Sequence, residues 1–223
     1  MIIDWDQIDT VLLDMDGTLL DLHYDNFYWV EHLPKLYAEK HNITLIDAKQ
    51  LLEEKLATKT GQLEWYCTDY WSAELGIEIA RTKAEDPVVN KIAFRPYAEH
   101  FLQTLRLMDK NVWLVTNAHR DVLSIKCQRL ELATHFDHLI SSHDFGFSKE
   151  HPYFWKNLQE QFPLNFSRSL FVDDSLPILR MAQQCGVAHV RAISQPDSKK
   201  PTKNTEEFYT LGLDTFVKKK GSS

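Results

Sequence analysis

The sequence lacks long apolar runs and any excess of positive charge. No hydrophobic stretch approaches the ~20 residues that a membrane span needs, and the opening MIIDWDQIDT is acidic where a signal peptide would be basic. The net charge of −7, with lysine and arginine scattered along the chain, argues against a broad surface for nucleic acid or anionic lipid. We therefore expect a cytoplasmic protein with no nucleic acid and no membrane as partner. Its expected partner is a small-molecule substrate, and its expected state is a monomer or weak homodimer.

Cysteine is also scarce. The three cysteines, Cys67, Cys127 and Cys185, are an odd number, lie far apart and include no C-x-x-C pair. This pattern favours reduced thiols packed in the interior over disulfides or a zinc site.

Short apolar runs rich in β-branched residues are what the sequence does contain. They predict buried strands at residues 10–13, 112–115, 138–142, 169–172 and 187–190. Helical spacing of apolar residues separates the later runs, as with Phe101, Leu105 and Met108. The alternation predicts an α/β fold with a Rossmann-like, doubly wound parallel sheet.

Residues 23–94 interrupt this alternation. Their apolar spacing indicates helices at 31–42, 47–60 and 63–76, with no convincing buried strand. We therefore expect a helical cap at 23–94 inserted after the first strand, and a core made of 1–22 and 95–223. A further helix is expected near 205–217.

Polar residues follow the predicted strands where each strand ends. The first strand is followed by DMDGT, the second by Thr116 and Asn117, and the fourth by Asp173 and Asp174, while Lys149 lies in the loop FGFSKEHP. Since the carboxyl ends of parallel strands share one edge of a sheet, these side chains should converge there.

Asp14 and Asp16 point to the same side of an extended chain, and Gly17 allows a sharp turn after them. Carboxylates this crowded need a cation, and a set of oxygen donors without histidine or cysteine at ligand spacing fits Mg²⁺. Lys149, Thr116 and the amides near Asn117 offer donors for an anion. A metal site beside an anion site indicates phosphoryl transfer.

Each of these signals is weak alone. D-x-D-G-T also forms simple turns, Thr-Asn also caps helices, a loop lysine is usually solvated, and an acidic pair often begins a helix. Their order along the chain is more specific.

That order, spanning residues 10–177, resembles the haloacid dehalogenase-like (HAD) hydrolase superfamily. The resemblance implies that Asp14 is the nucleophile, that Asp16 is the general acid and base, and that Thr116, Asn117 and Lys149 bind the phosphate. It implies Mg²⁺ held by Asp14, Asp16 through its backbone carbonyl, Asp173 and Asp174. Ile178 stands where a common form of the last motif has a second acid, so the paired-acid form fits better, with Asp174 preferred as direct ligand.

Within that superfamily, WYCTDYWSAELG, TNAH, FGFSKE and LFVDDSLPIL look like bacterial GMP/IMP nucleotidases. This narrower resemblance implies that the substrate is a purine nucleoside 5′-monophosphate. Trp65 and Tyr66 are candidates for stacking on the base, and Asp69, Asp25 or Asn26 for contacts to its edge. We expect His119 at the start of the helix after the second strand, near the phosphate, and leave it outside the catalytic set.

Other functions remain open at this stage. A broad-specificity sugar-phosphate phosphatase or a phosphomutase would have the same sheet and the same acids. In that case the aromatic residues of the cap would pack in the interior of the cap. A non-catalytic ligand-binding regulatory protein is an alternative of a different class. The intact set of Asp14, Asp16, Lys149 and Asp174 argues against the last.

Overall fold

The computed structural model describes residues 3–216 and contains a five-stranded parallel sheet. The strands lie in the order β3-β2-β1-β4-β5, with β1 in the centre. Their bounds are Thr10–Leu13 for β1, Asn111–Thr116 for β2, His138–Ser141 for β3, Ser169–Asp173 for β4 and His189–Ala192 for β5. The predicted fold class is confirmed, and only the last strand is displaced, beginning two residues later than expected.

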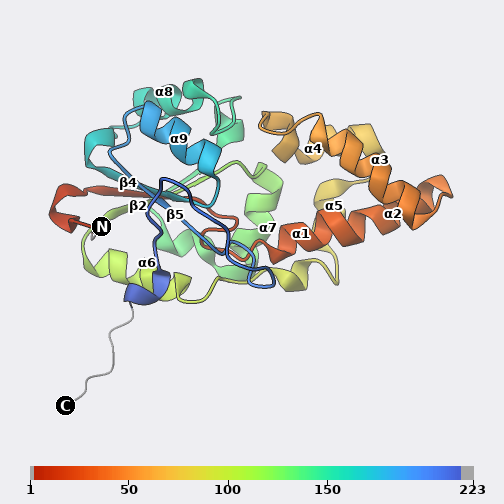
Figure 1. The fold of residues 1–223 in the computed structure, drawn as a ribbon, viewed down its shortest axis with the longest axis horizontal. Coiled ribbons are helices and arrows are strands. Elements are labelled where there is room, and N and C mark those ends of the chain that lie inside the picture. The colour runs from red at the N-terminus through yellow and green to blue at the C-terminus, as the bar shows by residue number, and fades with distance from the viewer. Residues whose placement is uncertain (1–2, 217–223) are drawn as a thin grey trace, which may run out of the picture.

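Helices cover both faces of the sheet, as the buried runs require. Val11 and Leu13 join the cluster beneath α6 (Ala98–Leu107) and α7 (Arg120–Leu130), whereas Leu12 joins the cluster beneath α8 (Pro152–Gln161) and α9 (Leu176–Gln184). Figure 1 shows α6 on the opposite side of the sheet from α8 and α9. Successive strand residues alternate between the two clusters because side chains in a strand point to opposite faces.

Residues 23–91 form a helical insertion between β1 and β2, which projects from one end of the sheet (Figure 1). It comprises α1 His23–Phe27, the π-helical η2 Tyr28–His32, α2 Leu33–His41, α3 Leu45–Ala57, η3 Leu63–Tyr66, α4 Thr68–Leu75, α5 Ile79–Ala84 and η4 Val89–Lys91. The other short helices are η1 Trp5–Gln7, η5 Leu132–His135, η6 Ser142–Asp144, η7 Phe166–Arg168 and η8 Leu213–Phe216.

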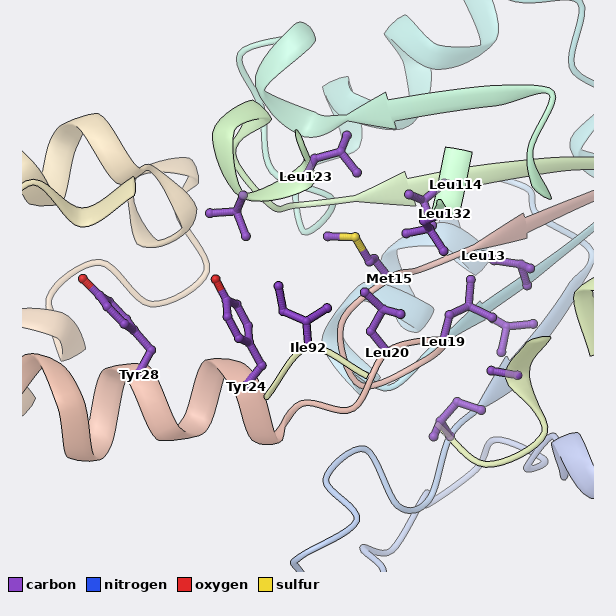
Figure 2. Close-up of a cluster of buried hydrophobic side chains, with 14 of the residues drawn as sticks. Leu13, Met15, Leu19, Leu20, Tyr24, Tyr28, Ile92, Leu114, Leu123 and Leu132 are labelled. Carbon is purple, nitrogen blue, oxygen red and sulfur yellow. The ribbon is translucent and has the colours of Figure 1, made fainter. Parts of the chain in front are cut away.

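The insertion and the sheet share one hydrophobic cluster. Tyr24 and Tyr28 lie along the first helical segment of the insertion, and Ile92 lies beside Tyr24 on the way back to the sheet (Figure 2). The same cluster continues through Met15 to Leu114 of β2. This continuous packing fixes where the insertion stands over the sheet edge.

Two expectations about helices were wrong. The helix expected at 63–76 breaks at Cys67, whose backbone is extended between η3 and α4, so Trp65 and Asp69 do not share one helix face. The tail has no helix at 205–212; a bridge pairs Thr210 with Ala192, and only the single turn η8 follows among the described residues. Within residues 3–216 we find no helix with the length and apolarity of a membrane span.

Candidate active site

The carboxyl ends of β1, β2 and β4 place acidic and polar residues at one edge of the sheet. Asp14 follows β1, Thr116 ends β2 and Asp173 ends β4. Gly17 is required after the acids, because its φ is +85° and a Cβ there would lie 2.8 Å from the Asp174 Cγ. The tight turn therefore brings the β1 loop directly against Asp174.

Lys149 connects two of these acids from a buried position. Its Nζ lies 2.6 Å from Asp14 Oδ1 and 2.7 Å from Asp173 Oδ2, and donates to the Val115 carbonyl at 2.9 Å. The lysine is 1% exposed. A loop lysine expected from sequence to be near the phosphate is thus fixed between two carboxylates, where three acceptors satisfy its three donors.

Carboxylate oxygens of Asp14, Asp173 and Asp174 lie within 4.8 Å of one another. Burial raises the pKa of Asp14 and of Asp173 to about 6 in spite of Lys149, and burial with the nearby Asp14 also raises that of Asp174. Crowded carboxylates with raised pKa values indicate a cluster with too little positive charge. An oxygen-only donor set of this kind fits Mg²⁺.

Asp16 turns toward the helical insertion rather than toward this cluster. Its Oδ1 lies 2.5 Å from the Nζ of Lys126 on α7, Lys126 lies 2.7 Å from Asp25 on α1, and Asp25 lies 2.7 Å from Lys83 on α5. We call these four residues the buried charge network. Both lysines are at most 2% exposed, so neither charge is screened by bulk water.

The network sets the protonation of its carboxyl groups. Burial raises the pKa of Asp16 to about 6, against the pull of Lys126. Asp25 is also buried, but its two lysine partners outweigh burial and lower its pKa to about 2. One carboxyl group of the network therefore holds a proton near neutral pH far more readily than the other.

The loop around Lys149 is tied to β2 and to the insertion. Asn117 accepts from the Lys149 backbone N–H at 2.9 Å and donates to Glu150 at 2.9 Å. The Tyr66 hydroxyl donates to the other oxygen of Glu150 at 2.7 Å. Thr116 accepts from the Ala118 N–H at 3.0 Å, which shapes the turn before α7. Asn117 and Tyr66 thus position the loop as well as lining the site.

A cavity of about 290 Å³ lies between the sheet edge and the insertion. The sheet side contributes the acids, Thr116, Asn117 and Lys149, and the insertion side contributes Trp29, Trp65 and Tyr66. The cavity therefore has a charged sheet edge, and its insertion side carries these aromatic side chains together with Asp25 and Lys83.

Of the three residues considered for the edge of a base, Asp25 and Asn26 line the cavity and Asp69 does not. Asp69 does not line the cavity, and its side chain is 80% exposed with Oδ2 3.7 Å from His119 Nε2. Asp25 is bound to two lysines, and the Asn26 amide donates to Asp197 at 2.7 Å. His119 does cap α7 and line the cavity, as expected.

Sequence reasoning missed Lys126, Lys83 and Glu150. Lys126 lies 110 positions from Asp16 and Lys83 lies 58 from Asp25, without any motif linking them. The sequence gives one weak indication of this network. Asp25 lies in the first helix of the insertion without an obvious basic partner nearby in the sequence. Glu150 directly follows Lys149 in the loop FGFSKEHP, and no sequence pattern indicates a role for it.

Comparison with known proteins identifies relatives along most of the chain. The sequence model of the haloacid dehalogenase-like hydrolases matches residues 8–186. The chain is 38% identical over 196 residues to the GMP/IMP nucleotidase YrfG of Escherichia coli (strain K12), covering 88% of this chain and 87% of that protein. The predicted resemblance to this superfamily of hydrolases is confirmed.

Solved structures share the fold at low sequence identity. A HAD phosphatase from Thermococcus onnurineus superposes with a TM-score of 0.75 at 17% identity, over 92% of this chain and 94% of that one. The HAD-hydrolase YfnB of Bacillus subtilis, bound to magnesium, gives 0.66 at 20% identity, over 93% and 96%. These solved structures therefore share the fold of this chain.

Proposed function

Because the chain belongs to the haloacid dehalogenase-like hydrolase family, we propose that it is a Mg²⁺-dependent phosphatase acting on purine nucleoside 5′-monophosphates. GMP and IMP are the expected substrates, by analogy with the E. coli relative. The products are the nucleoside and inorganic phosphate, and the reaction is placed in the cytoplasm, as the sequence predicts.

The single observation that carries this proposal is the arrangement of Lys149. Its ammonium lies between Asp14 and Asp173 in a cavity that aromatic side chains of the helical insertion also line. A fixed cation beside a carboxylate nucleophile suits a phosphoryl group, and flat apolar rings suit a base. The two ends of a nucleotide would thus meet two chemically different ends of one cavity.

Asp14 supplies the nucleophile in this proposal. A carboxylate oxygen of Asp14 attacks phosphorus, the bond to the 5′-oxygen breaks, and an aspartyl-phosphate forms. Lys149, which already holds Asp14 Oδ1 at 2.6 Å, orients that carboxylate and neutralises phosphoryl charge. Asp14, Asp173 and Asp174 would hold Mg²⁺, which supplies further charge neutralisation at the phosphoryl oxygens.

Asp16 supplies the proton for the leaving group. A carboxyl group with a pKa of about 6 is partly protonated near neutral pH, so it can protonate the 5′-oxygen as that bond breaks. The carboxylate left behind then takes a proton from the water that attacks the aspartyl-phosphate, which releases phosphate and restores both aspartates. Lys126 holds Asp16 during this cycle as a positioning residue.

Trp65 and Tyr66 are proposed to favour purines. Stacking of a base on an aromatic ring is worth roughly 1–3 kcal/mol, and both side chains line the cavity from the insertion. Tyr66 is held through its hydroxyl by Glu150, which fixes the ring against the loop that carries Lys149. Because Asp25 and Asn26 already have side-chain partners and Asp69 lies outside the cavity lining, the proposal assigns the base preference to stacking.

The test is phosphate release from a panel of 5′-nucleotides and sugar phosphates, with Mg²⁺ and after treatment with a chelator. The proposal expects Mg²⁺-dependent release with a higher kcat/KM for GMP and IMP than for pyrimidine nucleotides. Equal rates with sugar phosphates would favour the broad phosphatase, and an isomeric sugar phosphate without free phosphate would favour the phosphomutase. Nucleotide binding without turnover would favour the regulatory protein.

A further inference from the structure

A second cluster of ligand side chains lies beside the cavity, where the helical insertion meets the rest of the protein. Cys67 precedes α4 of the insertion, His119 caps α7, and His143 lies in η6 after β3. One ligand atom from each lies within 4.8 Å of the other two. Sulfur and imidazole nitrogen form a donor set for zinc, unlike the oxygen-only cluster around Asp14.

His143 has a buried ring nitrogen that no other group in the described part of the chain satisfies. Its Nε2 is buried and has no hydrogen-bond partner among residues 3–216. The backbone of Asn117 lies within reach of this ring, and since Nε2 has no partner among these residues, a carbonyl there would take the Nδ1 proton. A histidine that donates one N–H to a backbone carbonyl keeps the other nitrogen as a lone pair, the usual arrangement of a metal-bound imidazole.

The other two side chains are also held in place. The His119 Nδ1 lies 2.8 Å from the Thr68 hydroxyl, and its ring centre lies 4.8 Å from that of His143. The Cys67 sulfur accepts from the Tyr70 N–H at 3.4 Å. Asp69 Oδ2 lies 3.7 Å from His119 Nε2 and its side chain is largely exposed, so it would have to turn toward Cys67 and His143 to act as a fourth ligand.

We propose that Cys67, His119 and His143, with Asp69 or water, form a zinc site that ties the helical insertion to the sheet-bearing part of the protein. In tetrahedral zinc sites the ligand atoms lie about 3.3–3.8 Å apart, so the observed spacing needs only a small inward shift. The site differs in chemistry and position from the Mg²⁺ site proposed for the reaction.

The position of the site gives it a consequence for turnover. His119 and its partner Thr68 line the cavity, and Cys67 directly precedes Thr68 in the helical insertion. Substrate and product pass between that wall and the sheet edge, so zinc bridging them would slow exchange. This part rests on the proposed function, whereas metal binding does not.

The binding test uses the full chain with excess Mg²⁺ present, so that the oxygen cluster is occupied. Calorimetry with Zn²⁺ is expected to show one site, and Co²⁺ is expected to give the charge-transfer absorption of a cysteine ligand. Cys67→Ser should abolish that absorption and weaken Zn²⁺ binding at least tenfold, while serine retains the contact to the Tyr70 N–H. Cys185→Ser, another half-buried cysteine, is the matched control and should change neither.

His143→Gln provides a second variant, with at least a tenfold weaker affinity expected. Equal Zn²⁺ affinity in wild type and Cys67→Ser, or a cobalt absorption that persists in that variant, would overturn the site. Hydrolysis of p-nitrophenyl phosphate with Mg²⁺ tests the consequence: Zn²⁺ should slow wild type more than Cys67→Ser. Equal inhibition of both would assign the effect to the oxygen cluster and overturn the bridging role.

Discussion

Replacing Lys126 by methionine tests the buried charge network. Asp16 and Asp25 balance Lys83 and Lys126, and the Lys126 Nζ is the only group of the four that contacts both acids at 2.5 and 2.7 Å in the part of the chain described. Methionine fills most of the volume but removes the charge. Two buried carboxylates then share one lysine, which leaves one negative charge without a partner.

Removing one partner from a buried ion pair costs about 3–5 kcal/mol. For a protein of this size each kcal/mol lowers Tm by roughly 2–4 °C, so Lys126→Met should lower Tm by roughly 6–20 °C. Asp25→Asn removes the opposite charge and should also destabilise, because Lys83 loses its only carboxylate partner within residues 3–216. In the double variant Asp16 and Lys83 remain, and the formal charges balance again.

A double-mutant cycle measured by urea unfolding tests this. The double variant Lys126→Met with Asp25→Asn should lose less free energy of unfolding than the sum of the losses of the two single variants. Coupling energies for residues in one network are typically 0.5–3 kcal/mol. Lys156→Met on the exposed face of α8 is a control, expected within about 0.5 kcal/mol of wild type. Additive single effects would refute the network, as would a Lys126→Met variant as stable as the control.

The same variant also has a catalytic signature. Lys126 lowers the Asp16 pKa, which lies at about 6, so its loss should move that pKa upward. Asp16 acts as an acid in the first step, and the alkaline limb of the kcat/KM profile should shift to higher pH. An unchanged profile would separate Lys126 from the chemistry.

Three further outcomes are expected. Asp14→Asn should lower kcat at least about a hundredfold. The variant should still fold, because Lys149 keeps its ion pair with Asp173. Phosphate release measures the loss of activity and circular dichroism the fold, and a smaller loss of kcat would remove Asp14 from the nucleophile role. The pKa values of Asp14 and Asp173 are raised to about 6, so without Mg²⁺ their contribution to stability should fall as pH rises from about 4 through 6. Mg²⁺ should raise Tm more at pH 7.5 than at pH 5, because protons compete with the ion for the carboxylates. The opposite trend in a thermal scan would contradict the cluster. Trp65→Ala should lower kcat/KM for GMP about 5- to 150-fold and leave the rate of p-nitrophenyl phosphate hydrolysis near that of wild type. Tyr153→Ala, at an exposed tyrosine, is the control. An unchanged preference for GMP would assign Trp65 to packing.

The sequence by itself determined the sheet and the convergence of the acids. Runs such as residues 10–13 and 169–172, alternating with helical patterns, favour strands of a parallel sheet buried on both faces, and the carboxyl ends of parallel strands share an edge. The sequence therefore predicts that Asp14, Asp173 and Lys149 lie close together. These are consequences of local pattern and chain topology.

Only the tertiary structure decided how the insertion stands over that edge. Lys126 reads as an ordinary helix lysine, and its pairing with Asp16 and Asp25 exists because the cluster around Tyr24 seats α1 against α7. The break at Cys67 likewise depends on the packing of η3 and α4, and it brings a cysteine to two histidines that no sequence spacing connects. Such contacts are set by the packing of whole elements, so residues far apart in the chain become partners without leaving a local pattern.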